Sequence, residues 1–454
     1  MGSTQDWAAF ATSVKVTELP DAVRDRLRVL LLDQLGAQLA GSTRLWNGRV
    51  REYAIDQSRP GDASVVAGGT ASAEWAAFAN ATAGHGFEID DYHAAGLAHP
   101  GCVAVPATLA LAEQFDAPSE EVIVALALGF ESIIRLGLAT QPSMIYDRGF
   151  HETCAQGVFG AALAAGRLRK LESDAMASAM GIAGSHASGT TEYSQSGGEV
   201  KRVHAGLGAM GGLRAADLAS RGIPGPATIL EGRRGFLQAF AETSVEERLT
   251  DGLGHRWELV DTAIKPYFSC ALTHAPIDAM RQLIDEEGLR LDEVEAIEVG
   301  CDDLSLVHVG GIGPHPRDMT GAQFSLEYSL AMTLVLGAND FAAYSHAEEA
   351  GYELPEVTRI AERVRLVPDA AAEEVFPERF LARVRVTRND GSTVERQADA
   401  TGSPAAPIGE DAIRAKFRSI ATTVVGEERA DATEAAVARL FDGGPVRQVL
   451  AELR

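Results

Sequence analysis

The chain has 454 residues, of which 46% are hydrophobic and 23% charged, and its formal net charge is −24. This length exceeds what one hydrophobic core usually supports, so two domains are predicted. The acidic balance argues against nucleic-acid binding, because phosphate contacts need a basic surface.

Four scattered cysteines without CxxC spacing argue against a disulfide framework and a thiolate zinc site. They favour a reducing compartment, so a cytoplasmic location is predicted. The first residues lack the basic start and apolar run of a signal peptide. The longest apolar stretch, residues 122–130, ends at Glu131 and is too short to span a bilayer, so no membrane association is expected.

The first two-thirds of the chain carries helical patterns. Val23, Leu27, Leu30, Leu31 and Leu35 recur at helical spacing. Further helices rich in apolar or small residues are predicted at residues 75–83, 107–115, 119–139, 154–171 and 173–188. Their alanines and glycines permit close approach of helices, which predicts a layered helical bundle.

Near residue 260 the pattern changes from helical to alternating. Alternation at residues 297–301, 364–366 and 384–386 predicts strands, and Asn389-Asp390-Gly391 predicts a hairpin turn. An antiparallel sheet with one covered face is expected, together with helices at residues 273–287 and 324–336. Helical patterns return at residues 410–423 and 431–441.

The predicted fold is therefore mainly α with an inserted α+β domain. The helical domain comprises residues 1–262 and 403–454, and a smaller α+β lid domain comprises residues 263–402.

Residues 84–101 concentrate titratable side chains between two helix-like segments. Three histidines and three carboxylates lie there, a density typical of a site. Three interpretations are open: a solvated loop, a metal site of imidazoles and carboxylates, and an acid–base pocket without metal. The HExxH spacing of many zinc enzymes is absent from the sequence.

Other candidate residues precede small-residue helices. His151 lies at a predicted helix start, where the helix dipole lowers an imidazole pKa and favours a neutral base; capping the helix is the alternative role. Lys201, Arg202 and His204 follow a glycine pair and could bind an anion or form a solvated face.

Two further motifs lie later in the chain. Residues 206–211 match GxGxxG, but the sequence before them does not read as a strand, which favours close helix packing over dinucleotide binding. Lys265 and His274 lie where the second domain begins, and sites often form at such junctions.

Taken in the order in which they occur along the chain, these motifs resemble those of the MmgE/PrpD family. This family includes 2-methylcitrate dehydratases, cis-aconitate decarboxylases and an iminodisuccinate epimerase. The match extends from about residue 5 to the end, and its segments are residues 90–100, 149–151, 180–185, 201–206, 225–232, 265–274 and 323–328. The resemblance implies an all-helical domain with an inserted α+β lid, usually as a homodimer. It also implies that neither a cofactor nor a metal is needed.

The resemblance further implies an active site lined by His99, His151, Lys201 and Lys265. Two positions depart from the decarboxylases: Glu88 replaces the common Asp and Tyr92 the common Thr, which puts cis-aconitate itself in question as the substrate. The predicted catalytic residues are Asp91, His99, His151, Lys201 and Lys265, and the predicted substrate-binding residues are Glu88, Tyr92, Arg202, His204, His274 and Tyr328.

The reactions of this family share carbanion character next to a carboxylate. Such charge needs fixed cations, and the accompanying proton transfer suits histidine. On this acidic chain, a local cationic cleft is expected to hold the substrate. The sequence thus predicts a cofactor-independent lyase acting on a di- or tricarboxylate, with a 2-methylcitrate dehydratase-like hydro-lyase first. The alternatives are a cis-aconitate-type decarboxylase, an epimerase of a substituted succinate such as iminodisuccinate and, more remotely, a metal-dependent hydrolase or a non-enzymatic binding module.

Overall fold

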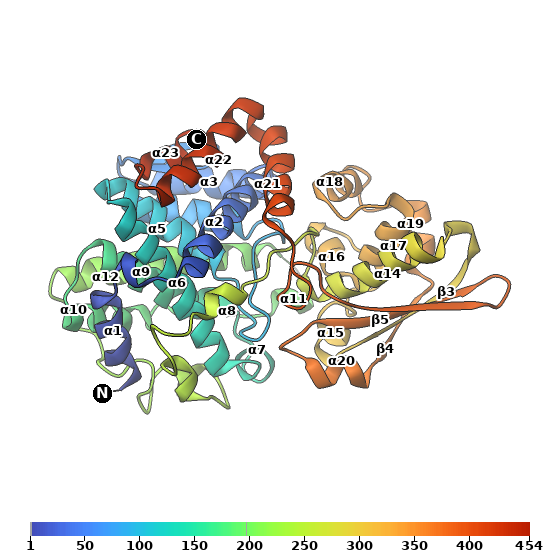
Figure 1. The fold of residues 1–454 in the computed structure, drawn as a ribbon, viewed down its shortest axis with the longest axis horizontal. Coiled ribbons are helices and arrows are strands. Elements are labelled where there is room, and N and C mark those ends of the chain that lie inside the picture. Colours follow the sequence, from blue (N-terminus) through green and yellow to red (C-terminus); the bar gives the residue numbers. More distant parts are fainter. Residues whose placement is uncertain (1, 197) are drawn as a thin grey trace. The chain divides into compact units, whose positions relative to one another are not determined.

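The computed structural model describes residues 2–196 and 198–454, and Gly197 of the predicted glycine pair lies outside them. The chain forms two compact units. The first comprises Met1–Tyr193, Glu199–Thr262 and Gly409–Arg454, and the second comprises Ser194–Gly198 and Ala263–Ile408. In Figure 1 the C-terminal helices, drawn in red, lie with the blue N-terminal helices of the first unit. The predicted class, mainly α with a smaller α+β part, is confirmed.

The first unit is a layered bundle of helices with one short hairpin, β1 (Ala63–Val65) and β2 (Gly69–Ala71). Its helices are α1 (Ser3–Ser13), α2 (Asp21–Ser42), α3 (Leu45–Gln57), α4 (Ala73–Gly84), α5 (Gly101–Phe115), α6 (Ser119–Thr140), α7 (Ser143–Tyr146), α8 (Glu152–Ala155), α9 (Gly157–Leu168), α10 (Ser173–Ala183), α12 (Val200–Ser220), α13 (Phe236–Phe240), α21 (Glu410–Val425), α22 (Glu427–Phe441) and α23 (Arg447–Ala451). The short helix α11 (Tyr193–Ser196) begins in this unit and continues into the second.

Small residues bring α12 close to α4 and α9, its main packing partners. A Cβ on Gly206 would lie 2.3 Å from Thr82 Oγ1, and one on Gly212 would lie 2.4 Å from the Ala161 Cβ. Larger side chains would therefore push the helices apart. The GxGxxG match at residues 206–211 lies inside α12 and serves this packing, so the interpretation of these glycines as packing residues is confirmed.

Helix α6 is a long, apolar helix of this unit. It is long and apolar enough to cross a bilayer, contrary to the short stretch expected from the sequence, but 94% of its apolar window is buried inside the protein. It also carries a buried ion pair, in which Arg135 Nε donates to Glu131 Oε1 at 2.7 Å. Arg135 further donates to the carbonyls of Asp251 and Arg256, each at 2.8 Å. We interpret α6 as a core helix that organises the loop around residue 251.

Arg135→Ala is expected to destabilise the protein by about 3–5 kcal/mol, because it leaves the buried Glu131 carboxylate without its countercharge and two carbonyls without this donor. Urea unfolding measures this free energy. The double variant Glu131→Gln/Arg135→Met is the control and should recover part of the loss, since it removes both charges. A loss below about 1 kcal/mol in the single variant would contradict the assignment.

The second unit contains a four-stranded sheet of order β4–β3–β5–β6, formed by β3 (Val294–Cys301), β4 (Val364–Pro368), β5 (Leu381–Arg388) and β6 (Thr393–Asp399). The predicted hairpin joins β5 to β6. The expectation of an all-antiparallel sheet is wrong, because β3 and β4 pair in parallel. The connection between these strands holds several helices, which return the chain to run in the same direction. Alternation alone cannot reveal this direction.

The helices of the second unit are α14 (His274–Glu287), α15 (Asp303–His308), α16 (Met319–Phe324), α17 (Leu326–Leu336), α18 (Phe341–Glu349), α19 (Pro355–Ala361) and α20 (Ala370–Val375). Of these, α14 packs on β5 and β6. Five 3₁₀ turns complete the described elements of the chain, at Val16–Glu18, Glu246–Leu249, Glu258–Asp261, Ala271–Thr273 and Leu291–Glu293.

Candidate active site

The histidine- and carboxylate-rich segment is the buried connection between α4 and α5. His85, Glu88, Asp90 and Asp91 are each at most 1% exposed, and Tyr92 is also buried. The interpretation as a solvated loop is therefore wrong. Burying so many polar groups is costly unless they are paired or hydrogen-bonded, and most of this segment is organised by such contacts.

The two neighbouring aspartates contact different groups. Asp90 Oδ2 lies 2.7 Å from His85 Nδ1 and 3.5 Å from His99 Nδ1. The Asp91 carboxylate instead accepts from the Gly101 backbone N–H at 2.9 Å, where α5 begins. The Asp91 carbonyl oxygen lies 2.8 Å from His99 Nδ1. Asp91 thus orients His99 through its backbone and stabilises the helix start with its side chain, whereas Asp90 supplies the carboxylate that faces the imidazoles.

His93 does not join this group. Its backbone pairs with Ala98, and its Nδ1 accepts from the Gly96 N–H at 3.1 Å, so the imidazole closes a tight turn.

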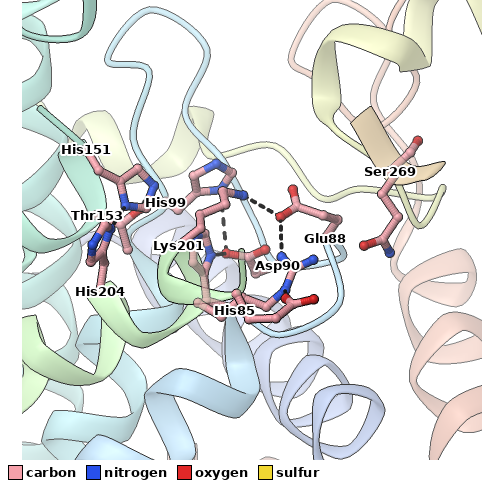
Figure 2. A network of polar contacts seen from close by, with 12 residues as sticks. His85, Glu88, Asp90, His99, His151, Thr153, Lys201, His204 and Ser269 are labelled. Atoms are coloured by element: carbon pink, nitrogen blue, oxygen red, sulfur yellow. Dashed lines mark hydrogen bonds and ion pairs between the residues drawn. The ribbon is translucent and has the colours of Figure 1, made fainter. Parts of the chain in front are cut away.

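Glu88 binds both cations at the start of α12. Its Oε1 pairs with Lys201 Nζ and, at 2.8 Å, with Arg202 Nη1, as the dashed lines of Figure 2 show for Lys201. Glu199 also accepts from Arg202, at 2.9 Å. The Glu88 backbone has φ +56°, a conformation that costs a non-glycine residue about 1–2 kcal/mol. The cations expected to form an open cleft are therefore already engaged by an internal carboxylate, which holds the loop in a strained conformation.

Helix α21, the first of the three C-terminal helices, contacts the same loop. Lys416 Nζ donates to the Ile89 carbonyl at 2.9 Å and pairs with Asp33 Oδ1 of α2 at 2.7 Å. Both side chains are buried. Because Ile89 lies between Glu88 and Asp90, this lysine positions the residues on either side of it.

Lys416→Met is expected to lower turnover by about 10- to 100-fold, because small displacements of reacting groups are costly. It leaves the Ile89 carbonyl without this donor, whereas Lys416→Arg keeps a charged donor and should retain more activity. Steady-state kinetics with urea unfolding would separate lost positioning from lost fold. Equal turnover in Lys416→Met and the wild type would contradict the positioning role.

Three imidazoles lie together beside Lys201. His151 stacks on His85 with ring centroids 5.5 Å apart, and His151 Nδ1 lies 2.9 Å from His204 Nδ1. Burial lowers the pKa of all three, strongly for His151 and to about 4 for His204, and Lys201 adds to the effect. These imidazoles are therefore neutral at neutral pH. The expected low pKa of His151 is thus present, but its main cause is burial and not the dipole of the four-residue helix α8.

Three predicted site residues belong to the second unit. Lys265 is fully buried, and the neighbouring Ile264 N–H donates to the Gly402 carbonyl at 3.1 Å. His274 is the first residue of α14, and its Nε2 lies 3.2 Å from the Ser269 carbonyl. The Tyr328 hydroxyl donates to the Tyr352 carbonyl at 3.3 Å, and burial raises its pKa to about 12.

The structure adds residues to the site that are absent from the predicted catalytic and substrate-binding sets, although His85 and Asp90 belong to the titratable segment at residues 84–101. His85 and Asp90 belong to the buried group, and Glu152, which follows His151, is a buried residue that is 6% exposed. Within the described residues, His85, Asp90 and His99 also form a group whose ligand atoms lie within 4.8 Å of one another and could hold a metal ion. One feature of the sequence could have indicated Lys416: lysine occurs only five times, so each lysine is a candidate for a specific role.

The first unit thus holds a buried acid–base group next to two cations, the kind of site that enzymes use for proton transfer near a carboxylate. Residues 5–248 match the model of the MmgE/PrpD N-terminal domain, and residues 267–442 match that of the MmgE/PrpD C-terminal domain. The chain belongs to the MmgE/PrpD family, as its motifs predicted.

Relatives resemble the chain over nearly its whole length. It is 30% identical to a cis-aconitate decarboxylase of Aspergillus terreus, over 99% of this chain and 96% of the relative. It is 25% identical to the cis-aconitate decarboxylases of Mus musculus and Homo sapiens, over 97% of this chain and 91% and 92% of theirs. The prediction of an enzyme of the lyase class is confirmed at the level of the family.

Proposed function

We propose that this chain is a cofactor-independent carboxy-lyase that removes CO2 from cis-aconitate or a closely related polycarboxylate. The observation that carries the proposal is the buried group in which neutral imidazoles lie beside Lys201, and Lys201 shares the Glu88 carboxylate with Arg202. The full-length similarity to proteins named cis-aconitate decarboxylase supports this reaction over the dehydration that the sequence reasoning placed first.

The chemistry requires an electron sink and a proton. The bond to the departing carboxylate breaks, its electron pair enters the neighbouring unsaturated carboxylate system, and a proton then adds to carbon. We propose that Lys201 and Arg202 hold a substrate carboxylate, which would share these cations with Glu88 or displace it. His99 would transfer the proton directly, or His151 would transfer it through the neighbouring His204. Lys265 is proposed as a further cation for the reaction, with Asp91 orienting His99, and Tyr92, His204, His274 and Tyr328 as substrate-binding residues.

The assembly is proposed to be a homodimer in the cytoplasm. Apolar side chains exposed on α3 and α12, among them Tyr53 at 53% and Leu207 at 41%, support a partner surface. Four free, buried cysteines are compatible with a reducing compartment. Light scattering after size-exclusion chromatography would measure the molar mass in solution, which distinguishes a monomer from a homodimer.

Proton NMR in D2O tests the reaction, using EDTA-treated protein with cis-aconitate, citrate, 2-methylcitrate and substituted succinates including iminodisuccinate. New methylene signals with release of CO2 would support the carboxy-lyase. A new olefin without CO2 would replace it with a hydro-lyase, and deuterium exchange or stereoisomer conversion alone would replace it with an epimerase. Activity lost on EDTA treatment and restored by a divalent metal would contradict cofactor independence. If none of these compounds reacts, the proposed substrates are wrong.

A further inference from the structure

A hydrogen-bonded chain links a buried carboxyl to the histidine pair of the first unit. Thr153 Oγ1 donates to Glu152 Oε1 at 3.4 Å and lies 3.2 Å from His151 Nε2. His151 Nδ1 in turn lies 2.9 Å from His204 Nδ1. Figure 2 shows His151, Thr153 and His204 gathered together. The chain therefore runs from a carboxyl through a hydroxyl to two imidazoles, and its longest step is the 3.4 Å between Thr153 Oγ1 and Glu152 Oε1, which is long for an O–H···O hydrogen bond.

The histidine pair needs a source of protons. Both imidazoles are neutral at neutral pH because burial, the neighbouring imidazoles and Lys201 lower their pKa values. A neutral imidazole is a poor acid, yet a carbanion formed by loss of CO2 must take up a proton.

Glu152 has the opposite electrostatic balance. Burial raises its pKa to about 7, and Asp90 adds to the rise, whereas Lys201 and the Thr153 hydroxyl oppose it. Its carboxyl is thus about half protonated near neutral pH. His151, whose Nε2 lies 3.6 Å from Glu152 Oε1, is neutral and contributes no opposing charge.

We propose that Glu152 is the proton store of the His151–His204 pair and that the Thr153 hydroxyl carries the proton between them. The inference rests on the proposed lyase function. When Glu152 is protonated, its hydrogen bond with Thr153 reverses direction. The acid O–H then gives its proton to Thr153 Oγ1, whose own proton passes to His151 Nε2. His204 gives its Nε2 proton to the substrate carbon, and the proton on His151 Nδ1 passes to His204 Nδ1, so each imidazole is left with one proton. One proton leaves Glu152 and one reaches carbon, and solvent reprotonates the carboxylate.

The test uses Glu152→Gln, which keeps the size of the side chain but cannot release a proton in this range. We expect kcat to fall by roughly 10²-fold with KM little changed, and the kcat–pH limb near neutrality to disappear. Thr153→Val should reproduce the loss, because it removes the carrier, and Thr153→Ser should restore activity. The exposed Glu172→Gln is the matched control and should behave as the wild type.

Wild-type kcat and an unchanged pH limb in Glu152→Gln would overturn the relay, as would wild-type turnover in Thr153→Val. Infrared difference spectra across neutral pH give a reading that needs no turnover: a protonated carboxyl band should titrate in the wild type and be missing in Glu152→Gln. If the wild-type enzyme converts none of the panel substrates, the proposed function is contradicted. If the titrating carboxyl band is absent from the wild-type spectrum, the role of Glu152 as a proton store is contradicted. Thr153→Val keeps the relay testable if Glu152→Gln does not fold.

Discussion

Lys201→Ala is expected to lower turnover by at least ~10²-fold, the range seen when a group that stabilises developing charge is removed. The Lys201 ammonium is buried beside His85, His151 and His204, and its removal takes away half of the cation pair that holds Glu88. Steady-state kinetics on the substrate identified by NMR would measure the loss. The effect should fall mainly on kcat if Lys201 acts on the transition state more than on bound substrate.

Two variants make this result specific. Lys201→Met keeps most of the aliphatic stem and removes the charge, so it should lose as much activity as Lys201→Ala. Lys15→Ala changes an exposed lysine and should leave turnover unchanged. Near-wild-type turnover in Lys201→Ala, with the fold intact by urea unfolding, would remove Lys201 from the site.

Most of the fold was predictable because helical and strand periods are local properties of the sequence. The predicted helix at 119–139 is α6 with one residue added, and the alternation around residue 299 became β3. The direction of β4 was not predictable, since it depends on how helices return the chain to the sheet. Short elements such as α7 and α8 carry too few residues to establish a period.

The site was predictable as a set of residue types and unpredictable as a set of contacts. In the sequence, Asp90 and Asp91 are two equivalent carboxylates. In the structure only Asp90 faces His85, because the Asp91 carboxylate accepts a hydrogen bond at the start of α5. The role of Lys416 depends on a contact across more than 300 residues of sequence, which no local pattern reveals. Nothing in the local sequence distinguishes Glu152 from an exposed glutamate, because its raised pKa comes from burial.

Lys265→Ala is expected to lower turnover by ~10²-fold or more, for the same electrostatic reason as Lys201→Ala. Lys265 is fully buried, and lysine is almost never fully buried unless its charge is paired or used. Its backbone position is fixed by the bond from Ile264 to Gly402, where a Cβ on the glycine would lie 1.9 Å from the Ile264 oxygen. Loss of the ammonium should therefore change charge more than local structure.

Kinetics of Lys265→Ala and Lys265→Met, with urea unfolding of both, would test this expectation. If the charge is what matters, the two variants lose turnover equally, because methionine restores the packing but not the ammonium. If packing is what matters, Lys265→Met recovers both turnover and stability, and Lys265 leaves the proposed catalytic set.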